Sequence, residues 1–170
     1  MGQTSPTERH EITEINCLYV PLIEEALLVP MSAVAEVVQS VQVKKQEGAP
    51  VWLEGWLEWR QKRVPLISFE ALANAPDNDR YQGALEGSTA LIMNTINPDK
   101  GLRYYAILAQ GFSHLVRIAE DDPLNPVEDT SKLQHVLMQV ELDGQIMQIP
   151  DLEVLESYVS DSLQSFLKSL

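Results

Sequence analysis

Short apolar segments separated by turn-forming residues restrict the fold of this chain more than any other feature. Val, Ile, Leu and aromatic residues gather in short runs, which Gly, Pro, Asn or Asp interrupts at brief intervals. Runs of this kind favour β-strands, and regular turn spacing favours a barrel or a sandwich. The end of the chain differs, because Leu155, Val159 and Leu163 recur there with helical spacing. The sequence therefore predicts a mainly β fold with a C-terminal helix.

The expected strands number about ten and fall into two groups. The first group comprises residues 15–22, 26–29, 40–44, 51–60 and 63–69, and the second comprises 89–95, 103–109, 112–118, 136–142 and 145–149. Helical turns are expected at 31–38 and 70–75, and the helix at 151–170. A turn is expected at Gln61 and Lys62, and Asp143-Gly144 is a hairpin signal.

Each group of strands is too small for a stable open sheet, and closure into a small barrel would remove its exposed edges. A length of 170 residues suits one domain or two small ones. We expect a mobile tail at 1–14, a first barrel at 15–75 that the helix 151–170 closes, and a second barrel at 76–150. Residues 76–88 would form a polar crossing loop, and the helix would pack on the first barrel.

The charge balance argues against several classes of partner. The formal net charge is -13, which disfavours binding to nucleic acid and to an anionic membrane surface. Residues 1–14 lack the apolar region of a signal peptide, and no apolar run is long enough to span a membrane. We therefore expect a cytoplasmic protein without direct membrane insertion.

Few residues suit catalysis or metal binding. His114 and His135 lie far apart in the sequence, and His10 lies in the expected tail. Cys17 has no local partner base, and a buried cysteine is usually inert. Asp121-Asp122 lacks the spaced oxygen ligands of a calcium loop. With no phosphate-binding glycine loop and no nucleophile elbow, the sequence predicts no catalytic, cofactor-binding or metal-binding residue and no enzyme activity.

The segment 44–63 is exceptional in charge and in aromatic content. Five basic residues and three acidic residues give it a local charge of +2, and it contains all three tryptophans of the chain. Arginine and tryptophan are enriched in the energetically dominant parts of protein interfaces. On an extended strand Trp56 and Trp59 would point to opposite faces, so one indole would be harder to bury. We therefore expect a surface patch that presents Arg60 and one indole to a protein partner.

The spacing of residues in this segment resembles the signature of CheW-like domains, the adaptor modules of bacterial chemosensory arrays. Pro50-x4-Gly55-x4-Arg60-x4-Pro65 carries the resemblance. Ala35-Glu36-Val37-Val38 is similar to the family's valine–glutamate–valine segment, and Ile149-Pro150-Asp151-Leu152 to its last strand and closing helix. The likeness covers residues 15–160. The family usually has Gly where Gln61 stands and Asp where Ser68 stands, so a divergent member is implied, most similar to accessory (ChpC-type) members of type IV pilus chemosensory systems.

The resemblance implies a fold and a function. The fold would be two SH3-like five-stranded barrels with short helices and a C-terminal helix. The function would be non-catalytic: to couple the cytoplasmic tip of a methyl-accepting chemoreceptor to the regulatory domain of a CheA-type histidine kinase, in chemotaxis or in twitching motility, without a cofactor. Arg60 corresponds to the family's signature arginine, and Val64 would lie alongside it. The expected protein-binding residues are Arg60, Val64, Trp56, Trp59 and Lys62.

Two alternatives remain open at the level of sequence. A small β-barrel could instead bind a small molecule, as a flavin-binding oxidoreductase does. A protein with the same adaptor surfaces could also block the assembly of an array rather than promote it.

Overall fold

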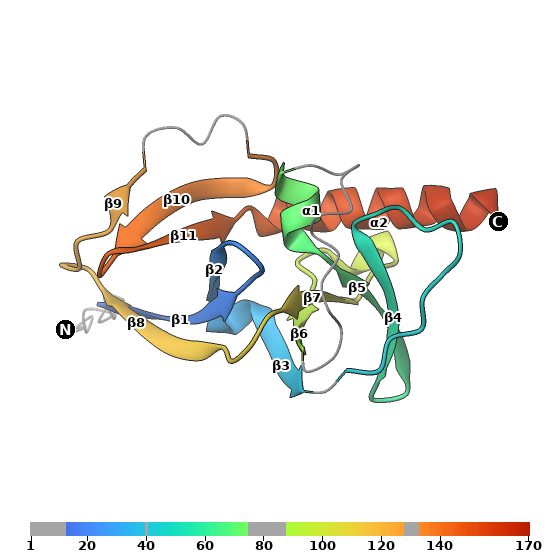
Figure 1. The fold of residues 1–170 in the computed structure, drawn as a ribbon, viewed down its shortest axis with the longest axis horizontal. Helices are drawn as coiled ribbons and strands as arrows, with labels where there is room; N and C mark the ends of the chain where they lie inside the picture. Colours follow the sequence, from blue (N-terminus) through green and yellow to red (C-terminus); the bar gives the residue numbers. More distant parts are fainter. Residues whose placement is uncertain (1–12, 40, 75–87, 128–132) are drawn as a thin grey trace, which may run out of the picture.

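The computed structural model describes residues 13–39, 41–74, 88–127 and 133–170, and Figure 1 shows their arrangement. The expected tail up to residue 12, His10, the crossing loop 76–87 and residues 128–132 lie outside the described residues. The elements are β1 (Glu14–Pro21), β2 (Ala26–Pro30), η1 (Met31–Ala33), β3 (Val34–Gln39), β4 (Leu53–Trp59), β5 (Lys62–Ile67), α1 (Phe69–Asn74), β6 (Thr89–Asn94), η3 (Pro98–Lys100), β7 (Tyr104–Ala109), β8 (His114–Ala119), β9 (Asn125–Pro126), β10 (Val136–Leu142), β11 (Gln145–Pro150) and α2 (Leu152–Ser169). The expected class, mainly β with a C-terminal helix, is confirmed.

Local differences from the expected elements occur in the first half of the chain. The helical turns expected at 31–38 shrink to η1, and the β-branched residues that follow form β3, which pairs with β6. The strand expected at 40–44 is reduced to one bridge between Lys44 and Trp56. The turn between β4 and β5 falls at Arg60 and Gln61, one residue earlier than expected.

Two sheets make up the β structure. Sheet A has the strand order β8-β1-β2-β11-β10-β9, and sheet B has the order β3-β6-β7-β5-β4. In Figure 1 the strands of sheet A lie to the left and those of sheet B to the right. Sheet A thus combines the first and last strands of the chain, whereas sheet B is built from its middle.

Each sheet closes into a barrel because the segment that follows one edge strand returns to pair at the opposite edge. In sheet B, β3 forms one edge, and Lys44 exchanges two backbone hydrogen bonds of 2.8 and 2.9 Å with Trp56 at the other edge. In sheet A, β8 forms one edge, and β9 pairs with β10 at the far side. Gly55 permits the first closure, because a Cβ there would lie 2.6 Å from the Lys44 carbonyl oxygen. Closure leaves few strand edges exposed to other chains.

The expected boundaries of the two barrels, 15–75 and 76–150, are wrong. Each half of the chain contains a hairpin, a single strand, a second hairpin and a helix, with the short strand β9 added in the second half, and each sheet takes a hairpin from the other half. The hairpin β1–β2 pairs with β8 and β11, whereas the hairpin β6–β7 pairs with β3 and β5. We call these two hairpins the exchanged hairpins. The exchange is possible because each hairpin offers an antiparallel edge and a parallel edge to strands distant in sequence.

Three apolar clusters fill the molecule. One lies inside sheet B and includes Trp59, Val64 and Ile92. A second lies inside sheet A and includes Cys17 and Met147. The third and largest lies between the sheets and under both helices, and it draws residues from β1, β2, β4, β6 and β7. The two barrels therefore share one core as well as having their own interiors.

Each helix fixes the exchanged hairpin of its own half with a carboxylate. Glu70 on α1 accepts hydrogen bonds of 2.9, 2.7 and 3.1 Å from the backbone amides of residues 23–25, between β1 and β2. Glu156 on α2 accepts bonds of 2.5 and 2.7 Å from the amides of Ile96 and Asn97, after β6. Both side chains are buried. Burial raises the pKa of Glu70, although its three amide donors oppose that rise.

The C-terminal helix α2 packs on the outside of sheet B. Its stripe residues Leu155, Val159 and Leu163 are buried in the shared core together with Trp52 and Trp56. Trp52 also makes an edge contact with the ring of Tyr158 at 6.1 Å. The expectation that the helix packs on the first barrel is correct for β4, but α2 also binds residues 96–100 of the second half.

Candidate protein-binding site

The turn between β4 and β5 is a two-residue hairpin connection. Trp59 pairs with Lys62, and the residues between them, Arg60 and Gln61, have φ angles of 47° and 61°. Positive φ at both central positions defines a type I′ turn, whose twist matches that of the flanking strands. The turn projects Arg60 away from the barrel, and 68% of its side chain is exposed. The structure therefore places Arg60 at the tip of the β4–β5 hairpin.

Glu36 holds Arg60 and Trp59 together. One carboxylate oxygen of Glu36 accepts a hydrogen bond of 2.9 Å from Arg60 Nη2 and one of 2.8 Å from Trp59 Nε1. The Arg60 guanidinium carbon also lies 4.7 Å from the centre of the Trp59 ring. Glu36 belongs to β3 and Trp59 to β4, which are the two edge strands of sheet B. Barrel closure thus brings these groups together.

The expectation that one indole is exposed is wrong. Trp56 and Trp59 do fall in different apolar clusters, but both are buried, with 8% and 7% of their surface exposed. Trp59 lies inside the barrel against Tyr104, whereas α2 covers the opposite face, where Trp56 lies. The Arg63 guanidinium carbon sits 4.3 Å from the centre of the Trp56 ring. Each indole thus supports an exposed arginine instead of offering its own face.

Val64 and Lys62 differ in burial, although both were expected to bind a partner. Val64 is 1% exposed and lies in the interior cluster of sheet B, so it supports the surface from below. Lys62 is exposed beside the turn. Of the five expected binding residues, Arg60 and Lys62 lie on the surface, and Trp56, Trp59 and Val64 lie beneath it.

Glu36 is the site residue that sequence reasoning missed. The sequence feature that could have indicated it is a single carboxylate within the valine-rich segment of β3, with no basic partner nearby in the sequence. Its contact with Arg60 spans 24 positions and depends on closure of the barrel. A second ion pair, of 3.2 Å between Lys44 and Glu58, crosses the same seam.

The cysteine and the two described histidines that were considered for catalysis or metal binding make packing contacts. Cys17 is buried inside sheet A, and burial raises the pKa of its thiol. His114 stacks on Tyr19 at 4.6 Å, and His135 lies 4.8 Å from the ring of Tyr158. Burial lowers the pKa of His135, against the opposing charge of Asp151.

Asp122 accepts a hydrogen bond of 2.6 Å from the backbone amide of Ala119, which makes it a turn residue. Within the described ranges, no three His, Cys, Asp or Glu residues are grouped so that they could hold a metal ion. Among the helices of the described chain, none combines the length and the apolar character that crossing a membrane requires.

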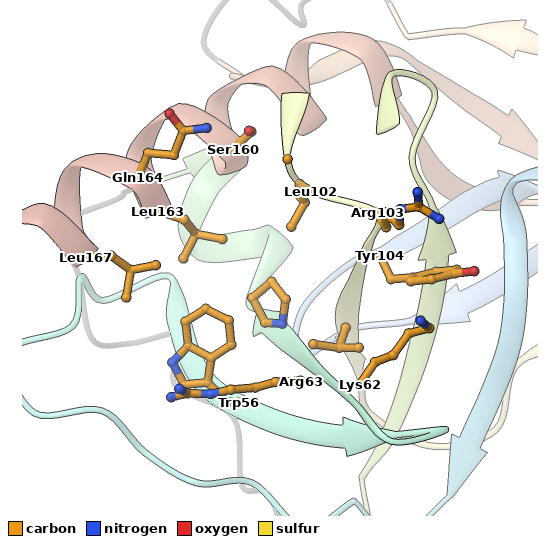
Figure 2. Close-up of a pocket in the computed structure, with 13 residues that line it drawn as sticks. Trp56, Lys62, Arg63, Leu102, Arg103, Tyr104, Ser160, Leu163, Gln164 and Leu167 are labelled. Carbon is orange, nitrogen blue, oxygen red and sulfur yellow. The ribbon is translucent and has the colours of Figure 1, made fainter. Parts of the chain in front are cut away.

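A cavity of about 330 Å³ lies alongside β5, starting at Lys62 directly after the Arg60 turn, and Figure 2 shows it. Its walls come from the β4–β5 hairpin, from residues 101–104 and from the C-terminal half of α2. Leu163 and Leu167 point from α2 toward Trp56, and Lys62 and Arg103 flank Tyr104. Trp56 and Lys62 are therefore parts of this cavity as well as of the hairpin.

Comparisons with known proteins agree with this architecture. The family model described as the CheW-like domain matches residues 16–158. A search of curated proteins found no match. Among solved structures, the crystal structure of the scaffolding protein TtCheW from Thermoanaerobacter tengcongensis is similar, with a TM-score of 0.67 and 18% sequence identity. The likeness covers 89% of this chain and 93% of that one, and it shows a common fold.

Proposed function

Because the chain belongs to the CheW-like domain family, we propose that it is a non-catalytic adaptor that couples chemoreceptors to a histidine kinase in a bacterial chemosensory system. It would bind the cytoplasmic tip of a methyl-accepting chemoreceptor and the regulatory domain of a CheA-type kinase. An adaptor of this kind would act in the cytoplasm, at membrane-attached receptor arrays. The similarity to accessory members favours a pathway that controls type IV pili.

The exposed but fixed position of Arg60 carries this proposal. One of its terminal nitrogens binds Glu36, and the rest of the guanidinium faces solvent and can donate further hydrogen bonds. A side chain that is already held in place loses little conformational freedom when a partner binds. The rest of the protein carries a strong negative charge, so a carboxylate of a partner would be attracted to this positively charged turn more than to other parts of the surface.

Charge reversal at Arg60 tests the proposal. We expect Arg60→Glu to weaken binding to a chemoreceptor cytoplasmic fragment by about 1–3 kcal/mol, measured by calorimetric titration. Because a glutamate there would also repel Glu36, Arg60→Asn is the cleaner variant: asparagine tolerates positive φ and removes the guanidinium, with its contacts to Glu36 and Trp59, without adding a negative charge. Lys168→Gln, which removes one positive charge from the end of α2, is the control. Unchanged affinity in both Arg60 variants would contradict a role for this turn.

Reconstitution distinguishes an adaptor from a competitor with the same surfaces. Added to receptor-containing membranes and the kinase, a coupling protein raises the receptor-dependent autophosphorylation rate. A competitor lowers the rate that an authentic coupling protein supports. We expect the rate to rise, and we expect Arg60→Asn to reduce that rise.

The alternative of a flavin-binding barrel receives less support from the packing. Side chains fill the interiors of both barrels, and Ala90, Ile92 and Ala106 in sheet B are completely buried. The cavity beside α2 lies outside the barrel interiors, and a second cavity of about 510 Å³ lies at the seam of sheet B, where Val38, Val41 and Leu57 line it. An absorbance spectrum of the purified protein with a flavin band would reverse this preference.

A further inference from the structure

The cavity beside α2 combines an apolar interior with a positively charged rim. Leu102, Leu163, Leu167, Pro65 and Trp56 form its apolar walls. Lys62, Arg63 and Arg103 are exposed around it, and none of its described lining residues is acidic. Three positive charges without a negative one are exceptional in a chain of net charge -13.

The three cations are available to a ligand. The ion pairs of Lys44 with Glu58 and of Arg60 with Glu36 do not involve the rim of this cavity. Arg63 rests on the Trp56 ring at 4.3 Å and shares one long contact of 3.4 Å with Gln46. A carboxylate placed above the cavity would therefore meet these charges without displacing an existing acidic partner.

The apolar surface extends beyond the cavity along α2. Leu163, Leu167 and Leu170 follow one another at helical spacing, and their exposed fractions rise from 5% to 48% to 71%. Figure 1 shows the last turns of α2 extending past β4. Such a stripe, continuous with a cavity of about 330 Å³, is longer than a compact small molecule needs and suits a helical segment that lies along α2.

We propose that this groove, formed by α2, β5 and residues 101–104, is a second docking site that binds an acidic amphipathic helix of a partner protein. An apolar side chain of that helix would enter the cavity between Leu102 and Leu163. Its carboxylates would face Lys62, Arg63 and Arg103. Arg60 and Glu36 do not line the groove, although Lys62, which follows the Arg60 turn, borders both surfaces.

Designed peptides test the charge and the apolar parts of the proposal separately. Three labelled helical peptides are titrated by fluorescence anisotropy: one with leucine on one face and glutamate beside it, one with lysine in place of glutamate, and one with serine in place of leucine. We expect the leucine–glutamate peptide alone to bind, with an affinity that falls as salt is raised. Equal binding of the lysine peptide, or no binding of the leucine–glutamate peptide below about 1 mM, would overturn the proposal.

Variants locate the bound peptide. The double variant Arg63→Gln/Arg103→Gln should weaken binding about tenfold, because two exposed ion pairs are lost. Leu167→Gln should weaken it by a similar factor. Arg117→Gln on β8 and Val154→Gln at the start of α2 are matched controls, since both residues are exposed and distant from the groove. If the controls weaken binding as much as the groove variants, the site is wrong.

Two further outcomes would also overturn the proposal. Decanoate that binds wild-type protein in calorimetry, while the leucine–glutamate peptide does not displace it, would mark a small-molecule pocket instead. Sedimentation that shows a dimer, abolished by Leu167→Gln, would mark an interface between copies of this chain. Arg60→Asn should leave peptide binding unchanged, so failure here and failure of the coupling function are distinguishable.

Discussion

Two neighbouring residues at the tip of the β4–β5 hairpin hold a left-handed backbone without being glycine. Arg60 and Gln61 have φ angles of 47° and 61°, where a Cβ crowds the backbone. The resemblance to CheW-like domains points to glycine at the position of Gln61. This chain therefore keeps the shape of the turn while carrying local strain at its second central residue.

Replacing Gln61 tests that strain. We expect Gln61→Gly to raise the free energy of unfolding by about 0.5–1 kcal/mol, since the relief at positive φ exceeds the extra freedom that glycine gains in the unfolded chain. Gln61→Ala, which keeps a Cβ, is the matched control and should bring no such gain. Urea unfolding followed by tryptophan fluorescence measures both. Equal stability of the two variants would show that the turn is unstrained.

The tryptophans show how far residue-level reasoning extends. The alternation of side chains along a strand correctly assigns Trp56 and Trp59 to opposite faces, because residues an odd number of positions apart point to opposite sides. It cannot reveal that α2, about a hundred positions later, covers the outer face. Nor can it reveal that Glu36 on β3 receives the Trp59 indole, because that contact needs the barrel to close. The exposure of Arg60 could be predicted from the sequence, because burying an unpaired guanidinium costs much free energy.

At the scale of elements, α2 is a structural part of the molecule as far as Phe166, and its last residues form an exposed surface. Leu163 is 5% exposed, and Ser160 and Gln164 both donate hydrogen bonds to the Lys100 carbonyl oxygen. Leu167, Lys168 and Leu170 are exposed. The helix therefore stabilises the fold as far as Phe166, and residues 167–170 contribute little to it.

Truncation separates these two parts. Deleting residues 160–170 should lower the thermal midpoint strongly, since the loss of Leu163 alone is worth about 2–4 kcal/mol. Deleting 168–170 is the matched control and should leave the midpoint nearly unchanged. Differential scanning calorimetry measures both. An unaltered midpoint in the longer deletion would mean that the helix is a docking element and not part of the core.

Strand pairing was the part of the element structure that sequence could not supply. The hairpin signal at Asp143-Gly144 and the apolar stripe of α2 are local, and both were located correctly. The choice of partner for β1–β2 is not local, because several short apolar strands offer equivalent edges. The shared core decides that choice, since only the exchanged arrangement buries residues of both hairpins between the sheets.

For the whole molecule, the exchanged hairpins and the shared core predict that the two barrels unfold together. Neither sheet is complete without strands from the other half of the chain. Local damage in one barrel therefore destabilises the other, and an intermediate with one folded barrel should not accumulate.

The positions of the tryptophans allow a direct test of this coupling. All three lie on β4 or just before it, and their fluorescence reports on the interior of sheet B, where Trp59 lies, and on the shared core, where Trp52 and Trp56 lie. Met147→Ala removes a buried side chain from the interior of sheet A. We expect it to shift the fluorescence-detected midpoint and the circular-dichroism midpoint by the same amount, with one transition in each. Ile92→Ala, inside sheet B, is the reciprocal variant. A Met147→Ala transition that fluorescence does not detect would show independent barrels.

The split origin of sheet A also determines when the protein can fold during its own synthesis. The first hairpin leaves the ribosome at Pro30, yet its neighbour β8 begins at His114 and β11 at Gln145. Because synthesis proceeds at about 5–20 residues per second, the nascent β1–β2 hairpin has neither neighbouring strand for a time on the order of seconds. A product that ends before His114 lacks both partners of this hairpin, so such an incomplete chain exposes unpaired strand edges that favour aggregation.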